Sequence, residues 1–293
     1  MQTKIKKTLI LVFLCGFFGS LCPAASVFGA INPDELPIPS EWIRGEPCRL
    51  DASFVISVGS VLKKRTEKQG VILVDVRKRD AFEKFRIPGS LNMPLFGIKT
   101  KTFLRNKSLV LINEGYSCAR LVRECRRLRE QGFTRAAVMF GGLWSWKQQG
   151  GPMDGDVFSQ ETLNQVTAAD FFEQRGLQNQ VVVNISEKAD RAALDLIPRT
   201  VFVPYGKKDP TFSARMKDAL RPSGHDPLSL ILIYNRDGRY PMDMVTLMRK
   251  SGVRNFYLLK DGIKGYRNFI RKQARIRQKR NEKIIIRKCP TCP

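Results

Sequence analysis

Two stretches of this chain share one order of features: a run of large apolar residues, then a loop containing glycine, then a helical pattern. In the first stretch the apolar run covers residues 109–112 and the helical pattern residues 119–131. In the second, the run covers residues 230–234 and the helical pattern residues 242–250. Short continuous apolar runs are typical of buried parallel strands. We therefore predict two strand–loop–helix units, each with its loop at the positive end of a helix dipole, where N–H groups favour an anion or a thiolate.

Strand and helix patterns alternate around the first unit. Residues 71–76 and 136–140 are apolar runs that predict strands, whereas residues 53–66 and 80–85 predict helices. Strands separated by helices indicate a parallel sheet that is covered on both faces. The fold class is therefore α/β.

The alternation returns in the second half of the chain. Residues 167–175 predict a helix that begins after a Thr N-cap, and residues 181–185, 201–204 and 256–259 predict strands. A repeat of this length is a duplicated domain rather than a solenoid unit. The expected divisions are a signal peptide at 1–30, a proline-rich segment at 31–49, a first domain at 50–150, a linker at 151–164, a second domain at 165–270 and a basic tail at 271–293.

The N-terminus has the layout of a secretory signal peptide. Three lysines precede an apolar run at residues 8–21, and small residues follow it. The run is shorter than a membrane-spanning helix usually needs. We expect export to the periplasm, with an uncleaved leader that anchors the protein as the alternative.

The chain is strongly basic, with a formal net charge of +24. Residues 267–293 alone contain ten Lys or Arg and a single acidic residue. No nucleic acid is expected in an exported compartment. The charge therefore favours an acidic protein partner, a small anion such as a sulfur oxyanion, or an anionic membrane surface that the tail contacts. The alternative is a solvated basic face.

Short motifs accompany the first unit in a fixed order. They are Asp-Val-Arg at 75–77, Ile-Pro-Gly at 87–89, the strand–loop–helix unit itself and Gly-Gly-Leu at 141–143. In this order they resemble a rhodanese domain. The second half is similar but more degenerate, with Ile-Pro at 197–198 and Gly-Ile at 262–263. The resemblance implies two rhodanese-like domains, each a parallel sheet flanked by helices, and it implies that the Asp75–Arg77 pair braces the first of them.

The resemblance also implies a reaction that this sequence lacks the residue to perform. In that family, a cysteine directly after the central strand takes a sulfur atom from thiosulfate or another donor and holds it as a persulfide. Here Asn113 and Asn235 stand at that position. A side-chain amide donates and accepts hydrogen bonds but cannot form a persulfide.

The two loops still contain residues that could bind an anion without covalent chemistry. Gly238 and Arg239 match the family's Gly and Arg positions in the second loop, and Arg236 is a second possible cation. In the first loop we expect Gly115 and Arg120 to bind the anion. We expect this loop to be about two residues longer than the second. Arg236 and Arg239 could equally be solvated surface residues.

Cysteines occur at two further places that could carry chemistry, near the first loop and at the C-terminus. Cys118 is expected near a helix N-terminus with Arg120 close by, an environment that lowers a thiol pKa, so it is the one plausible displaced nucleophile. The alternative is a small residue that starts a helix. Cys125 is expected in the core, too far along the helix to pair with Cys118. Cys289 and Cys292 form a Cys-x-x-Cys that could serve redox or metal chemistry, although no second pair or histidine supports it.

The sequence thus predicts an exported tandem rhodanese-like protein that is a non-catalytic anion-binding or protein-interaction module. A sulfurtransferase or persulfide carrier that uses Cys118 is the alternative. We expect no cofactor and no metal site.

Overall fold

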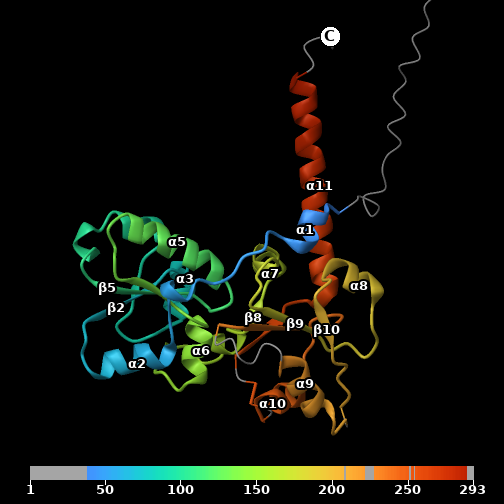
Figure 1. The fold of residues 1–293 in the computed structure, drawn as a ribbon, viewed down its shortest axis with the longest axis horizontal. Helices are drawn as coiled ribbons and strands as arrows, with labels where there is room; N and C mark the ends of the chain where they lie inside the picture. Colours follow the sequence, from blue (N-terminus) through green and yellow to red (C-terminus); the bar gives the residue numbers. More distant parts are fainter. Residues whose placement is uncertain (1–37, 208, 222–227, 251, 254, 289–293) are drawn as a thin grey trace, which may run out of the picture.

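The structure is a computed structural model that describes residues 38–288 apart from 208, 222–227, 251 and 254. The predicted signal peptide, Cys289 and Cys292 lie outside these residues. Figure 1 shows two lobes side by side, the first formed by the blue and green part of the chain and the second by the yellow to red part.

The first lobe is built on a five-stranded parallel sheet with the strand order β1-β6-β5-β2-β4. Its strands are β1 (Val55–Ile56), β2 (Val71–Asp75), β4 (Leu91–Asn92), β5 (Ser108–Ile112) and β6 (Ala136–Met139). Its helices are α2 (Val58–Thr66), α3 (Arg79–Lys84), α4 (Leu95–Lys99), α5 (Cys118–Glu130) and α6 (Gly142–Gln148). All four described side chains that follow Ser108 in β5 are buried, as expected for a central strand covered on both faces.

The second lobe repeats this sheet. Its strand order, read from β8, is β8-β12-β11-β9-β10, and all of its strands are parallel. The strands are β8 (Gln165–Val166), β9 (Gln180–Asn184), β10 (Thr200–Phe202), β11 (Leu230–Tyr234) and β12 (Phe256–Leu259). The helices are α7 (Ala168–Gln174), α8 (Arg191–Leu196), α9 (Phe212–Leu220), α10 (Met242–Lys250) and α11 (Gly262–Lys288). The predicted α/β class, with parallel sheets flanked by helices, is confirmed.

Some boundaries differ from the prediction. The helix expected at 53–66 begins only at Val58, because Ser57 caps it by accepting a hydrogen bond from Ser60 N–H. Residues 55–56 instead form the edge strand β1. The second lobe's edge strand β8 is equally short, and two residues are too few for a recognisable pattern.

The segment between the lobes is ordered and packs on the first lobe. Its strand β7 (Asp154–Gly155) pairs antiparallel with β3 (Phe85–Arg86), and the 3-10 helix η3 (Ser159–Thr162) follows. This segment therefore forms one wall of the first lobe rather than a free tether.

The chain that precedes the first lobe runs along the second. Cys48 N–H donates to the Gly176 carbonyl at 3.0 Å, and Leu50 N–H donates to the Asn179 side chain at 3.1 Å. The segment before the first lobe thus packs against the second lobe.

The last helix extends well beyond the second lobe, as Figure 1 shows for α11. Its first turns are buried, with Tyr266 and Ile270 each 1% exposed. Further along, Arg277 reaches α1 (Ser40–Arg44), where it pairs with Glu41 at 3.2 Å and lies over the Trp42 ring. The predicted continuation of this helix into the basic tail is confirmed through Lys288. No helix among the described residues is long and apolar enough to span a membrane.

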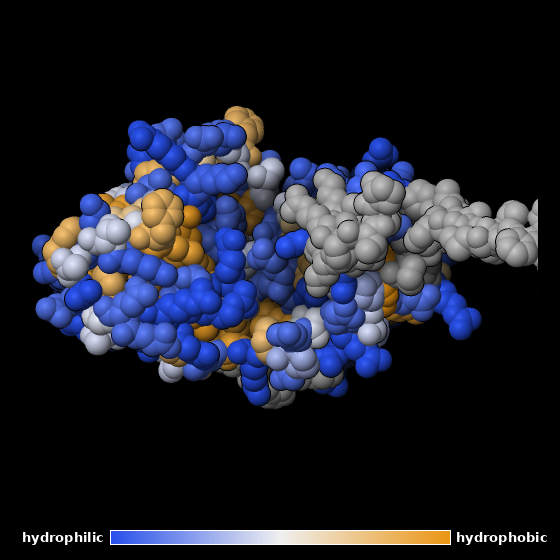
Figure 2. All heavy atoms as spheres, turned by 90° about the horizontal axis from the view of Figure 1, so that it is seen from above, coloured by the Kyte–Doolittle hydropathy of each residue, from blue (hydrophilic) through white to orange (hydrophobic). Residues whose placement is uncertain are grey.

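The face in Figure 2 is largely blue, with hydrophobic side chains in separate patches rather than one continuous band. Among the exposed apolar residues, Phe158 in the segment between the lobes is 82% exposed.

Candidate functional site

The loop after β5 is fastened to the start of α6 by backbone hydrogen bonds. Leu143 N–H donates to the Asn113 carbonyl at 2.9 Å, and Trp144 N–H donates to the Glu114 carbonyl at 3.0 Å. This close approach requires glycine at position 142, where φ is +48° and a Cβ atom would overlap the Asn113 carbonyl. The Gly-Gly-Leu motif therefore fixes the position of the loop.

The second lobe holds its loop in the same way. Ile263 N–H donates to the Asn235 carbonyl at 2.9 Å, and Lys264 N–H donates to the Arg236 carbonyl at 3.1 Å. Gly262 has φ +55°, and a Cβ atom there would overlap the Asn235 carbonyl. The two asparagines thus occupy equivalent positions in equivalent loops.

The first loop is closed by the second lobe. Gln174, at the end of α7, accepts a hydrogen bond from Ala119 N–H through Oε1 at 2.9 Å, and its Nε2 donates to the Tyr116 carbonyl. Ala119 N–H lies in the first turn of α5, where N–H groups lack partners within the helix. A neutral side chain from the other lobe therefore occupies the position that an anion would take.

Aromatic and acidic side chains from the second lobe complete the closure. The Tyr257 ring packs edge-on against Tyr116 at 5.3 Å between centroids. Ser117 Oγ donates to Asp170 Oδ1 at 3.2 Å. Asn113 is only 4% exposed. The floor of this loop is consequently shut off from solvent.

Cys118 lies in this closed region, where its surroundings are the opposite of those predicted. It is 1% exposed, and burial raises the pKa of its thiol to about 12. The prediction of a lowered pKa is wrong, because desolvation outweighs the helix dipole and none of the described cations shifts the pKa back. Cys125 is fully buried, so its predicted place in the core is confirmed, and both thiols are free.

The predicted length of the first loop is also wrong. Helix α5 begins five residues after Asn113, whereas α10 begins seven residues after Asn235. The first loop is therefore the shorter one. Arg120 consequently falls on α5 rather than in the loop, and it is exposed.

The second loop is occupied by its own asparagine. Asn235 Oδ1 accepts from Gly238 N–H at 2.6 Å, and its Nδ2 donates to the Arg239 carbonyl at 2.6 Å. Arg239 N–H donates to the Asp237 side chain at 3.1 Å. The N–H groups predicted to face an anion thus donate to oxygens of the loop itself.

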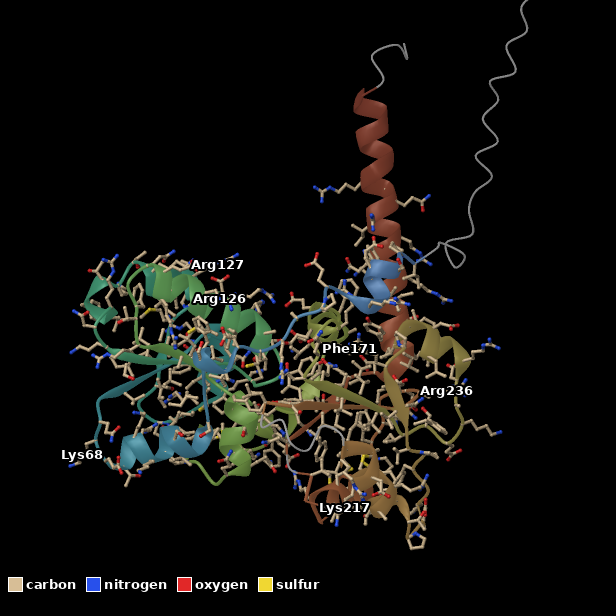
Figure 3. The ribbon with its side chains drawn as sticks, viewed as in Figure 1. Lys68, Arg126, Arg127, Phe171, Lys217 and Arg236 are labelled. Carbon is tan, nitrogen blue, oxygen red and sulfur yellow. The ribbon has the colours of Figure 1, made fainter. Side chains whose placement is uncertain are left out.

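The loop's two arginines lie on the surface. Arg236, labelled in Figure 3 on the second lobe, is exposed, and the Arg239 side chain is 92% exposed. The Arg239 guanidinium lies 3.8 Å from the Asp237 carboxylate. This ion pair is too exposed to contribute much stability. Their predicted role in anion binding stays a prediction.

The Asp75–Arg77 pair braces the first lobe, as the resemblance implied. Arg77 Nη2 donates to Asp75 Oδ2 at 2.8 Å and to the Phe85 carbonyl at 2.7 Å, and both charged side chains are buried. In the second lobe, Asn184 accepts from Ser186 N–H at 2.9 Å and keeps the turn without the charges.

Beside the first loop lies a cleft of about 630 Å³ that the sequence analysis missed, here named the Glu114 cleft. It is bounded by the end of β2, by α3 and by the segment between the lobes. Its lining residues are Arg77, Lys78, Asp80, Ala81, Lys84, Phe85, Glu114, Asp156, Phe158, Ser159, Thr162 and Leu163. A volume of this size falls in the range of small-ligand sites. The one signal in the sequence was a carboxylate directly after a buried strand.

Glu114 is the acid of this cleft whose pKa is raised. Burial raises the pKa of its carboxyl group. A hydrogen bond from its own backbone N–H and the charge of Arg77 lower that pKa, and the charges of Asp75 and Asp170 raise it. The residue keeps contact with solvent at the mouth of the cleft, so the rise is moderated by screening. Desolvated acids in clefts are candidates for binding or chemistry.

The described residues contain no group of three or more His, Cys, Asp or Glu side chains that could hold a metal ion. Cys289 and Cys292 lie beyond those residues, so their redox or metal role stays a prediction. Nothing in the described lobes suggests a place for a metal in the two loops.

The family of the first lobe follows from its sequence. Residues 59–149 match the family model of the Rhodanese-like domain. This part of the chain is a rhodanese-like domain and belongs to the sulfurtransferase superfamily.

Several solved structures resemble the chain. A Bacillus halodurans protein is 22% identical over 35% of this chain and 77% of its own, with a TM-score of 0.32. The rhodanese-like domain of an Anabaena protein is 25% identical over 36% of this chain and 83% of its own, also with a TM-score of 0.32. The thiosulfate sulfurtransferase of Pseudomonas aeruginosa is 19% identical over 72% of this chain and 42% of its own, with a TM-score of 0.31. No curated protein sequence matches the chain.

Proposed function

We propose that this chain is a tandem rhodanese-like protein that does not transfer sulfur and instead serves as a protein-interaction module. The observation that carries the proposal is the amide at the end of the central strand in both lobes, Asn113 after β5 and Asn235 after β11. An amide can neither attack a sulfur donor nor hold a persulfide.

The tandem assignment is supported by the repeated strand order and by the two equivalent loops. In each lobe, the carbonyl of the asparagine accepts a hydrogen bond from the residue after a glycine with positive φ. The second lobe is therefore interpreted as a degenerate copy of the first.

A protein-interaction role fits the loops better than small-anion binding does. The amides of Ala119 and Gly238 already donate to the side chains of Gln174 and Asn235. An anion would have to displace these partners and leave their polar groups unpaired. The open Glu114 cleft and the exposed side chains of Arg236 and Arg239 face solvent, where a partner can reach them.

The competing hypothesis is sulfur transfer through Cys118. It requires a thiolate that a sulfur donor can reach, whereas burial raises the pKa of this thiol and leaves 1% of the residue exposed. A sulfur donor would reach it only if the contact between the lobes opened.

The test is a thiosulfate:cyanide assay on the purified full chain, with an active sulfurtransferase measured in parallel. We expect no thiocyanate above the rate without protein. Thiocyanate formation that disappears in Cys118→Ser but persists in the matched control Cys125→Ser would replace this proposal with the competing hypothesis. Mass spectrometry after thiosulfate treatment should likewise find no sulfur adduct on Cys118.

The cause of the inactivity can be tested by restoring a thiol to each loop. The Asn235 side chain is half-buried and in contact with solvent, whereas the Asn113 side chain is buried in the loop that the second lobe covers. We therefore expect Asn235→Cys to be modified by thiosulfate or polysulfide, and Asn113→Cys to remain unmodified. This pair separates the loss of the nucleophile from the closure of the site.

A further inference from the structure

A small pocket, here named the Tyr266 pocket, lies on the side of the second lobe's sheet that α1, α7 and α11 cover (Figure 1). Its volume is about 40 Å³, which is room for roughly three water-sized groups. Much of its lining consists of buried apolar or aromatic side chains, none of them more than 7% exposed. They are Phe171, Leu177, Val182, Leu196, Ile197 and Tyr266. This lining suits an apolar group of a few carbon atoms.

Three arginines line the same pocket, and none of its lining residues is acidic. They are Arg44 at the end of α1, Arg175 directly after α7, and Arg199 between α8 and β10. Arg44 and Arg199 are exposed, so they mark the mouth of the pocket, and neither forms an ion pair within the described part of the chain. All the charge on the lining is therefore positive.

Arg175 is held by neutral groups rather than by a carboxylate. Its guanidinium donates to the carbonyls of Phe172 and Glu41, the latter at 3.2 Å, and lies 3.7 Å from the centre of the Phe172 ring. Its Nε is buried and has no partner among the described residues. Burial lowers the pKa of Arg175, and the charges of Tyr266, Glu41 and Glu46 raise it. Both glutamates are exposed and neither lines the pocket, so the buried side of this cation lacks a counter-charge.

The Tyr266 side chain adds a second polar group without a partner. The residue is 1% exposed, and its ring packs on that of Phe171, labelled in Figure 3, with 4.7 Å between centroids. Its hydroxyl forms no hydrogen bond with any of the described residues. Buried hydroxyl and guanidinium N–H groups are normally hydrogen-bonded, because leaving them unpaired costs free energy. A ligand atom that accepts hydrogen bonds in the pocket would remove this cost.

The two parts of the lining select the chemistry of the ligand. A carboxylate accepts hydrogen bonds from guanidinium and hydroxyl groups and carries the opposite charge. An inorganic anion would satisfy the arginines but leave the apolar side chains uncovered. A neutral apolar molecule would cover those side chains but leave the guanidinium of Arg175 unpaired. A molecule that has both a carboxylate and a short apolar group meets both conditions.

We propose that the Tyr266 pocket binds a carboxylate that carries a short apolar group. The apolar group lies on the buried side chains, and the carboxylate lies among Tyr266, Arg175 and the two arginines of the mouth. A free branched short-chain carboxylate and the C-terminal residue of a partner protein share this chemistry. This site goes beyond the proposed function, because none of its lining residues belongs to either loop.

The test uses the full chain with carbon-13 in the methyl groups of Ile, Leu and Val, titrated with isovalerate and followed by NMR. We expect saturable shifts of the Ile43, Val182, Leu196 and Ile197 methyl groups, which line the pocket. Isovaleramide has the same shape without the charge, and acetate has the charge without the branched group. Each should bind at least about tenfold more weakly. Shifts that do not saturate, or an affinity for either control equal to that for isovalerate, would overturn the proposal.

Arg44→Gln combined with Arg199→Gln removes two exposed charges from the mouth and should weaken isovalerate binding at least about tenfold. Arg191→Gln combined with Arg236→Gln is the matched control, because it lowers the net charge equally at two exposed positions outside the pocket. Equal weakening by the two pairs would reflect only a general attraction to the basic chain and would refute the site. Unchanged affinity in Tyr266→Phe, which removes only the hydroxyl, would likewise contradict it.

Nα-acetyl-valine distinguishes the two sources of the carboxylate, because it presents the end of a chain with the preceding amide. Binding tighter than that of isovalerate would assign the pocket to a protein C-terminus, and equal or weaker binding would assign it to a free carboxylate. Either result supports the carboxylate site. The sulfur-transfer assay is independent of these titrations. A failed titration therefore removes only the Tyr266 pocket, whereas thiocyanate formation removes only the proposed function.

Discussion

Gln174 of the second lobe caps a helix of the first. Its Oε1 accepts the hydrogen bond of Ala119 N–H at 2.9 Å, although the two residues are 55 positions apart in sequence. Caps usually come from residues next to the helix. Here the cap couples the start of α5 to the docking of the lobes, so the closed loop and the interface depend on the same side chain.

Replacing Gln174 should therefore lower stability. Gln174→Leu leaves Ala119 N–H buried without its partner and removes one of the two hydrogen bonds to the Tyr116 carbonyl, which keeps the bond from Cys118 N–H. We expect a loss of about 1–3 kcal/mol in the free energy of unfolding. Urea denaturation followed by circular dichroism would measure it. Gln178→Leu, at an exposed position four residues on, is the control and should change stability by less than about 0.5 kcal/mol. Equal effects of the two would show that the cap is unimportant.

Gly115 tests the packing between the lobes more severely. Its φ is +131°, and a Cβ atom would overlap both the Gly141 carbonyl and the Tyr257 hydroxyl. Gly115→Ala should therefore destabilise by more than about 3 kcal/mol or prevent folding, because it combines backbone strain with a clash. Gly70→Ala has positive φ but no atom within 4 Å, so it isolates the strain at about 1 kcal/mol. Similar thermal unfolding midpoints for the two variants would contradict the close approach.

Cysteine reactivity should follow burial. At pH 8 a thiol with a pKa of about 12 is ionised in only about one molecule in ten thousand. We expect iodoacetamide to modify the half-buried Cys48 well before Cys118 or Cys125, and all three to react once urea unfolds the chain. Peptide mass spectrometry of timed samples would measure the order. Alkylation of Cys118 as fast as that of Cys48 would show that the lobes open readily.

The sequence predicted the two sheets well because their central strands are continuous apolar runs. The bounds expected for the second unit, residues 230–234, 242–250 and 256–259, match β11, α10 and β12. Edge strands β1 and β8 were not predicted, because each has only two residues and is a strand only through its pairing with the neighbouring strand. In these cases tertiary pairing, rather than local pattern, decides the conformation.

The site was less predictable for a different reason. The sequence shows that Asn113 and Asn235 replace the expected cysteine. It does not show which residues form hydrogen bonds with each loop. Nothing in the sequence near Gln174 marks it as the cap of a helix in the other lobe, and nothing near Cys118 predicts burial deep enough to outweigh the helix dipole. Both features depend on how two folded surfaces meet.

The carboxyl group of Glu114 should make stability depend on pH in an unusual direction. Burial raises its pKa above the ordinary 4.5, so the folded chain holds this proton more tightly than the unfolded chain does. Ionisation of Glu114 therefore lowers stability as pH rises from about 4.5 through the folded pKa. Relative to wild type, Glu114→Gln should be more stable at pH 7, by less than about 1 kcal/mol because the residue is solvent-exposed, and equal at pH 4. Urea denaturation of both proteins at the two pH values measures this difference, with Glu83→Gln showing none of it. A Glu114→Gln variant that is less stable than wild type at pH 7 would mean that the carboxylate has a partner that stabilises its charge.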